Sequence, residues 1–188
     1  MCCCKLDLHR FNYSIGIHPW KINEARLSTY IDFIERYAAF DCVKAIGECG
    51  LDKLCNTPWS AQLRAFVAQI KISETLKKPL IIHCVKAYDE LIALKKEMAP
   101  CQAWIIHGFR GKPEQMKQLV NRPGLYLSFC PKFNKKTFQL TPLDRVFVET
   151  DDSKCTIEEV YKNGCSLLSI PEKSFMQIIE KNYNTLFS

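Results

Sequence analysis

Five residues of types that bind metal ions each close a different apolar run of the sequence: His18, Glu48, His83, His107 and Asp151. Imidazole and carboxylate groups together bind Zn²⁺, Mn²⁺, Fe²⁺ or Mg²⁺, and a set rich in histidine favours the transition-metal ions. A single histidine after a strand is usually a structural residue held by a hydrogen bond. Five such residues after five apolar runs indicate a shared metal site.

The residue types also predict how such a site would be divided. A carboxylate can bridge two ions that lie about 3.5–4 Å apart, whereas a neutral imidazole binds one ion. Glu48 is therefore the expected bridge, and His83 with His107 is the expected pair for one ion. Asp151 is expected to bind the other ion and to orient or deprotonate a water molecule. Residue types alone thus supply one complete site and about half of another.

The apolar runs are typical of parallel strands that are buried on both faces. They cover residues 14–17, 43–47, 79–82, 103–106, 125–129 and 145–148. Helical patterns cover residues 24–40 and 58–77, and two more helices are expected to begin near 112 and 171. Thr57 is the expected N-cap of the second helix and Pro58 its first residue. Strands that alternate with helices predict βαβ units and a parallel sheet.

An open, doubly wound sheet and a β/α barrel both fit this alternation. No glycine-rich phosphate loop follows the first apolar run, which argues against a nucleotide-binding sheet. In a barrel the carboxyl ends of the strands surround one mouth, where the five polar residues would converge. The sequence therefore predicts an α/β protein with a TIM-type (β/α) barrel, of which six strands can be identified.

The composition predicts one globular domain over residues 1–188. The chain has 47% hydrophobic residues and a net charge of +6, which permits an anionic partner. We expect no membrane span, because no apolar run approaches about 18 residues, and no signal peptide, because the first residues contain no apolar h-region. The 11 cysteines include no C-x-x-C pair, so buried thiols in a cytoplasmic protein are expected rather than disulfides.

Five motifs together resemble the TatD family of metal-dependent hydrolases, which are commonly described as DNases. In chain order these motifs are Gly16-Ile17-His18-Pro19, Gly47-Glu48-Cys49-Gly50-Leu51-Asp52, Ile82-His83-Cys84, Ile106-His107-Gly108-Phe109 and Glu149-Thr150-Asp151. The resemblance covers residues 11–188, leaving 1–10 as an atypical N-terminal segment. Residues 108–114 resemble a compact bacterial subgroup. The family's fold is the barrel of the amidohydrolase-like superfamily.

The resemblance implies a role for each residue of the set. Glu48 would bridge two divalent cations, of Mg²⁺, Mn²⁺ or Zn²⁺. His83 and His107 would complete the site of the second ion, and Asp151 would serve the first. Glu48 and Asp151 would be the catalytic pair. His18 would lie in the mouth and would either contact a phosphate or have a supporting role.

The sequence departs from the family at its start. Relatives open with a strand that ends in D-x-H-x-H, whose two histidines bind the first ion. Asp7 and His9 match the beginning of that motif, but residue 11 is Phe. We therefore expect either that the barrel lacks its first one or two strands because the chain is part of a longer protein, or that the first metal site has been lost.

The leading functional hypothesis is a hydrolase that cleaves phosphodiester bonds of DNA without sequence specificity, through a water activated by metal ions. Single-stranded DNA is the expected substrate, and no obligate protein partner is expected. Arg110 and Lys86, together with Lys53 and Lys112, would contact phosphates.

Three further residues and two alternative functions complete the predictions. Trp20 and Phe109 would either stack on unpaired bases or pack in the core and rim. Asp52 would hydrogen-bond within the site or form a turn. One alternative function is a degenerate, non-catalytic relative that acts as a binding module. The other is a metal-dependent hydrolase with a substrate that is not nucleic acid.

Overall fold

The computed structural model describes residues 11–187, so Asp7, His9 and the rest of the N-terminal segment lie outside the described residues. Within that range one parallel sheet is formed by β1 (Tyr13–Ile15), β2 (Val43–Asp52), β3 (Leu80–Val85), β4 (Trp104–Ile106), β5 (Leu125–Phe129) and β6 (Val146–Val148). All six correspond to the apolar runs expected to be strands.

The helices fill the connections between these strands. The α-helices are α1 (Leu27–Ala38), α2 (Trp59–Leu76), α3 (Tyr88–Met98), α4 (Pro113–Val120), α5 (Lys135–Leu140), α6 (Ile157–Leu168) and α7 (Glu172–Phe187). Short 3-10 turns are η1 (Pro19–Lys21), η2 (Glu24–Arg26) and η3 (Leu143–Arg145). Three helices, α3, α5 and α6, have no counterpart among those expected. The third of them begins at a capping box formed by Thr156 and Glu159, a signal that the sequence does contain.

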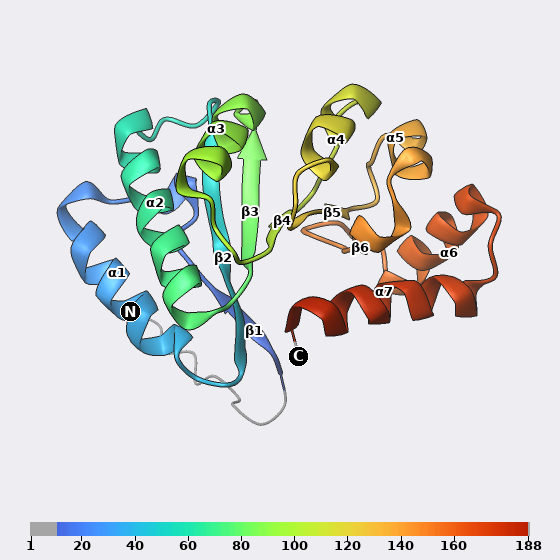
Figure 1. Cartoon of the computed structure of the whole chain (residues 1–188), viewed down its shortest axis with the longest axis horizontal. Helices are drawn as coiled ribbons and strands as arrows, with labels where there is room; N and C mark the ends of the chain where they lie inside the picture. The colour runs from blue at the N-terminus through green and yellow to red at the C-terminus, as the bar shows by residue number, and fades with distance from the viewer. Residues whose placement is uncertain (1–10, 188) are drawn as a thin grey trace.

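The strands lie in the sheet in the same order as in the sequence, from β1 to β6. A doubly wound sheet would reverse direction at one strand, and none of the described strands does so. The sheet curls, with α1 to α3 beside β1–β3 and α4 to α7 gathered around β4–β6 (Figure 1). The architecture is therefore a half-barrel of the TIM type, with β1 and β6 at its two edges.

Two strands run further than expected, which corrects the placement of two site residues. Glu48 and His83 lie inside β2 and β3, not at their ends. Between Ile46 and Cys49 the register of β2 against β3 shifts, because three steps along β2 match two along β3. Such a bulge bends a strand and re-aims its side chains, and it lets Glu48 lie half exposed within an otherwise buried strand.

The start of α2 also differs from the expectation. Pro58 is the N-cap residue and Trp59 the first residue of the helix. The Thr57 hydroxyl does not cap the helix but donates a hydrogen bond to the carbonyl of Pro19, 2.7 Å away. Thr57, the residue expected to cap α2, thus links η1 to the segment at the start of α2 by a hydrogen bond.

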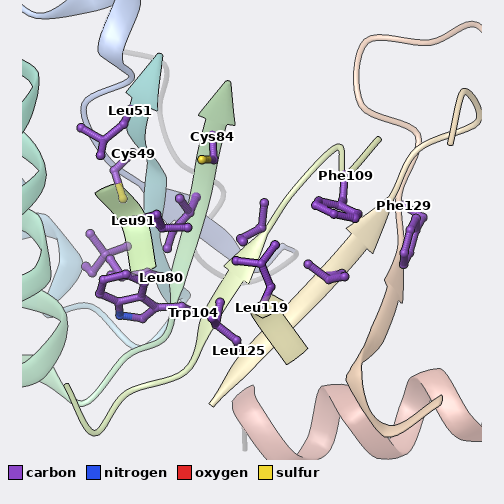
Figure 2. Close-up of a cluster of buried hydrophobic side chains, with 14 of the residues drawn as sticks. Cys49, Leu51, Leu80, Cys84, Leu91, Trp104, Phe109, Leu119, Leu125 and Phe129 are labelled. Carbon is purple, nitrogen blue, oxygen red and sulfur yellow. The ribbon is translucent and has the colours of Figure 1, made fainter. Parts of the chain in front are cut away.

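The core is built from strand residues and the inner faces of the helices. Trp104 and Leu80 lie in it (Figure 2), and the ring of Trp104 packs against Phe66 of α2 with centroids 5.6 Å apart. Phe109 is only 1% exposed and meets Phe129 edge to face, with centroids 6.0 Å apart (Figure 2). The hypothesis that Phe109 stacks on a base is therefore wrong, since its ring is part of the core.

Two glutamines of α2 fix the backbone on which the site is built. Gln69 is fully buried, accepts a hydrogen bond from the N–H of Ile17 and donates one to its carbonyl, at 2.6 and 3.3 Å. Gln62, two helical turns earlier, accepts a hydrogen bond from the N–H of Asp52 and donates one to the carbonyl of Asp52, at 2.8 and 3.0 Å. One helix face thereby holds the segment before His18 and the end of β2.

Two further expectations concern the chain as a whole. Every cysteine among residues 11–187 is a free thiol, as the sequence predicts. In the same range no helix combines the length and apolar character that a membrane span requires.

Gly50 provides a test of how tightly β2 and β3 are joined. Its φ is +140°, and a Cβ there would lie 2.0 Å from the carbonyl oxygen of His83. Gly50→Ala should lower the free energy of unfolding by more than about 3 kcal/mol, because backbone cannot move aside. Gly124→Ala is the control: its φ is +69° with no contact under 3.7 Å, so about 1–2 kcal/mol is expected. Equal losses in chemical denaturation would contradict the close approach.

Candidate metal centre

One carboxylate oxygen lies at the centre of the candidate site. Oε1 of Glu48 is 3.2 Å from His18 Nε2 and 3.1 Å from His83 Nδ1, and it touches His107 Nε2. These residues come from β2, from β3, from the turn after β4 and from the start of η1. The structure thus brings together four of the five residues that the sequence places in one site.

The fifth residue, Asp151, lies on the exposed turn that follows β6. Oxygen or nitrogen atoms of His107, Glu149 and Asp151 lie within 4.8 Å of one another. A Cβ on Gly108 would be 3.8 Å from carboxylate oxygens of both Asp151 and Glu149. Asp151 therefore belongs to the His107 side of the mouth.

The charges of Glu48 and His107 stabilise each other. Burial raises the pKa of Glu48, but hydrogen bonds from His107, His18 and His83 outweigh burial and hold the pKa far below its usual value. Burial lowers the pKa of His107, but the carboxylates of Glu149 and Glu48 outweigh it and raise the pKa to about 10. Without a bound cation, a proton on His107 balances the charge of Glu48.

A buried carboxylate lies behind His83. Asp52 is 2% exposed, and its Oδ2 lies 3.1 Å from His83 Nε2. The same carboxylate accepts hydrogen bonds from Trp20 Nε1 at 2.6 Å and from the N–H of Leu54 at 2.7 Å. Burial raises the pKa of Asp52, but these donors outweigh it and leave the pKa below its ordinary value. Glu48 and Asp52 lie 3.1 Å from the two nitrogens of His83 and both accept, so the ring can donate to either. With a cation on Nδ1 in place of a proton, the ring proton would be held on Nε2 by Asp52.

A second carboxylate has the same relation to His107. Oε1 of Glu149 lies 3.3 Å from His107 Nδ1 and accepts a 2.7 Å hydrogen bond from the N–H of Gly108. Its Oε2 accepts from the hydroxyl of Ser128. With a cation on Nε2 in place of a proton, the remaining proton of His107 would be held on Nδ1 by Glu149.

The third ring, that of His18, has a hydrogen-bond donor behind it instead of a carboxylate. Its Nδ1 accepts a 3.1 Å hydrogen bond from the backbone N–H of Trp20, as the cap of η1. A neutral ring with a lone pair on Nδ1 carries its proton on Nε2, which is the nitrogen that faces Glu48. His18 therefore offers the centre a hydrogen-bond donor, although it lies as close to Glu48 as His83 does.

These residues fit a divalent cation. His83 Nδ1 and His107 Nε2 both face the same carboxylate oxygen, a donor set that suits Zn²⁺ or Mn²⁺. His107 Nε2 is buried and lies in contact with Glu48 Oε1. A cation that replaced the ring proton would be held between these two atoms.

A cleft of about 620 Å³ opens beside the centre and is lined by both His83 and His107. Lys86 and Arg110, two of the residues expected to contact phosphates, line it and are exposed. Lys53 instead forms an ion pair with Glu90, and Lys112 is the N-cap of α4; neither lines the cleft. The expected phosphate contacts are thus reduced from four residues to two.

Two carboxylates of the site are absent from the set of candidates chosen from the sequence as ligands. Asp52 lies four residues after Glu48 on β2, and Glu149 directly follows β6. The even spacing places Asp52 on the same side of the strand as Glu48, which is a signal that the sequence contains. The pairing of each carboxylate with its histidine joins residues 31 and 42 positions apart, which no local pattern reveals.

The fold and the donor set together define a β/α half-barrel with a candidate metal centre on the side of its sheet where the carboxyl ends of the strands lie. The sequence model of the family described as TatD related DNase matches residues 7–188. The chain belongs to this family, as its motifs predict.

The curated relatives agree with this assignment. The chain is 33% identical over 147 residues to a protein of Escherichia fergusonii named 3'-5' ssDNA/RNA exonuclease TatD, covering 72% of this chain and 55% of that protein. It is 35% identical over 147 residues to a protein of Buchnera aphidicola named as an uncharacterized metal-dependent hydrolase, covering 73% and 54%. The chain therefore spans about half the length of these relatives.

Solved structures confirm the fold. A TatD homologue from Escherichia coli K12 matches with a TM-score of 0.80 at 24% identity, covering 94% of this chain and 76% of the other. A TatD family hydrolase from Entamoeba histolytica matches with a TM-score of 0.78 at 20% identity, covering 94% and 74%. The expectation of an incomplete TIM-type barrel is therefore confirmed.

The raised pKa of His107 predicts how cation binding depends on pH. A cation needs the lone pair of Nε2, so below pH about 10 it must displace a proton from His107. Near neutral pH, binding of Mn²⁺ should release about one proton, and affinity should rise with pH. Calorimetry in buffers of different protonation enthalpy measures this release. His107→Gln should bind weakly and release no proton; a release equal to that of the wild type would contradict the assignment.

Proposed function

We propose that this protein is a metal-dependent hydrolase that cleaves phosphodiester bonds in nucleic acid, with DNA as its substrate. The observation that carries this proposal is the convergence of three imidazoles on Glu48, two of which line a cleft with basic residues on its rim. Cations at the centre and basic groups beside it suit a phosphate with negative charge on both sides of the reacting atom.

The proposed ligands are Glu48, His83 through Nδ1, His107 through Nε2, and Asp151. Glu48 is proposed to lie between two divalent cations, with the two imidazoles on one and Asp151 on the other. Mg²⁺, Mn²⁺ and Zn²⁺ all fit carboxylate and imidazole groups. When bound, such cations acidify a water molecule and stabilise negative charge on the phosphate.

The side chains around the ligands would perform the remaining steps. Asp151 is exposed at the mouth and is proposed to accept the proton of the attacking water. His18 presents its Nε2–H toward Glu48 and would donate a hydrogen bond to Glu48 or to a phosphate oxygen. Lys86 and Arg110 would hold phosphates on either side of the scissile bond.

The relatives support nucleic acid as the substrate class, since one is named an exonuclease of single-stranded DNA and RNA. A single strand also suits the open rim of the cleft, where Trp20 is 60% exposed. Contacts to phosphates carry no sequence information. The cleavage is therefore proposed to be non-specific.

Two alternatives remain as outcomes of the experiments below. A protein that holds DNA without cleaving it would be a binding module derived from an enzyme. Turnover of dipeptides or lactones but not DNA would define a hydrolase of another class.

The free thiols among residues 11–187 favour a reducing location, and we propose the cytoplasm. That residues 1–188 form a single domain stays a prediction.

Activity is tested with labelled single-stranded DNA and Mn²⁺ or Mg²⁺. The wild type should produce short products, and Glu48→Gln should reduce the rate more than about 100-fold because the central carboxylate charge is lost. Asp151→Asn should do the same with little change in stability, since Asp151 is exposed. Glu97→Gln and Asp144→Asn change exposed carboxylates elsewhere and are the matched controls. Metal-dependent cleavage that survives Glu48→Gln would refute the proposal.

Phosphate contacts are tested by the salt dependence of binding. In protein that carries Glu48→Gln, Lys86→Ala and Arg110→Ala should each reduce the slope of log affinity against log salt by about 0.7, because each removes one contact to a single strand. Lys162→Ala changes an exposed lysine of α6 that does not line the cleft, and it should leave the slope unchanged. Equal slopes in all variants would show that the rim does not hold the backbone.

A further inference from the structure

The positive charge of the chain is concentrated in one stretch of the sequence. Residues 115–143 contain no aspartate or glutamate but include Lys117, Arg122, Lys132, Lys135 and Lys136. These five cationic residues nearly equal the net charge of +6 that the whole chain carries. The last three lie in the loop after β5 and at the start of α5, and all three are exposed. We call residues 132–136 the lysine segment.

The charge of the lysine segment is not balanced by neighbouring carboxylates. Among residues 11–187, none of its three lysines forms an ion pair, whereas Lys53 and Arg64 are paired with Glu90 and Glu24. Like charges gathered on one surface raise the local electrostatic potential and attract anions. The lysine segment is therefore a candidate contact for an anionic partner.

Two side-chain hydrogen bonds join the lysine segment to the wall of the cleft. Before the segment, Sγ of Cys130 accepts from Arg110, which lines the cleft, at 3.5 Å. After the segment, the Thr137 hydroxyl donates to the carbonyl of Gly111, which also lines the cleft, at 2.8 Å. The lysine segment is thus held beside the cleft at both its ends, with α5 next to α4 (Figure 1).

Cationic residues near the cleft follow three neighbouring strands. Lys86 comes directly after β3, Arg110 follows β4 and Lys132 follows β5. These strands are adjacent in the sheet, where neighbouring strands lie about 4.8 Å apart. The three residues therefore form a row that starts beside the metal centre and leads away from Glu48 on β2, toward α5.

The opposite side of the metal centre has a different character. A groove of about 380 Å³ lies there, beside β1, and reaches His18 and Glu48. In the described part of the chain its lining includes the apolar side chains of Ile17 and Phe33 and one cation, Lys21. Since phosphates are held by cationic groups, a chain of phosphates is held better on the β5 side than on the β1 side.

We propose that the lysine segment binds phosphates of a single-stranded nucleic acid beyond the cleft, so that the substrate leaves the metal centre across the ends of β4 and β5. This inference rests on the proposed function for the class of substrate. Contacts to phosphates away from the reacting bond add affinity without sequence specificity. Because the lysine segment lies at the far end of the row, an oligonucleotide that only fills the cleft does not reach it.

The test compares two lengths of single-stranded DNA, about 4 and about 16 nucleotides, in protein that carries Glu48→Gln. Adding Lys132→Ala, Lys135→Ala and Lys136→Ala together should reduce the slope of log affinity against log salt by about 2 for the longer strand. The reason is that each phosphate contact to a single strand contributes about 0.7 to this slope. For the shorter strand the slope should fall by less than about 0.7, whereas Arg110→Ala should lower it for both lengths.

The matched control removes the same charge elsewhere. Lys71→Ala, Lys173→Ala and Lys181→Ala together change three exposed lysines of α2 and α7, and should leave both slopes unchanged. Both triple variants should unfold at the wild-type temperature, since every residue that they change is exposed.

The outcomes separate this inference from the proposed function. An unchanged slope for the longer strand in the lysine-segment variant, or an equal decrease for both lengths, would overturn the inference. Absence of nuclease activity in the wild type, together with a loss of binding that depends on length, would refute the proposed function but support the role of the lysine segment.

Discussion

A neutral imidazole has two nitrogens and one proton, so the group behind the ring decides what its front can offer. The candidate metal centre depends on this constraint at three rings. Carboxylates behind His83 and His107 can hold the ring proton and free the front nitrogen for a cation, whereas a backbone N–H behind His18 leaves a proton facing Glu48. Three residues of one type thus supply two ligating nitrogens and one donor around a single carboxylate oxygen.

A few elements of the half-barrel hold the groups around the imidazoles in place. Parallel strands in sequence order bring their carboxyl ends to one side, and the bulge in β2 aims Glu48 into that space from within the strand. Gln62 and Gln69 on α2 hold the backbone at Asp52 and just before His18. The backs of the imidazoles are therefore set by buried backbone and buried side chains, while their fronts remain at the edge of an open cleft.

The same arrangement separates the roles of the acidic residues. Asp52 and Glu149 each accept three hydrogen bonds from groups of the protein, which leaves them engaged as partners of histidines. Glu48 meets only imidazoles, and Asp151 is exposed at the mouth. An imidazole can exchange its proton for a cation, whereas the backbone, indole and hydroxyl donors that hold Asp52 and Glu149 cannot, so the kind of donor distinguishes ligand from support where distance alone does not.

The sequence by itself determined the six strands, their parallel arrangement, the family and the residues that meet at Glu48, because apolar runs and short motifs are local signals. It did not determine that Glu48 and His83 lie inside strands, since a bulge depends on the register with a neighbouring strand. Nor did it reveal that Phe109 is core. The partners of the imidazole nitrogens were decided only by tertiary structure, because they come from other strands or from the geometry of a turn.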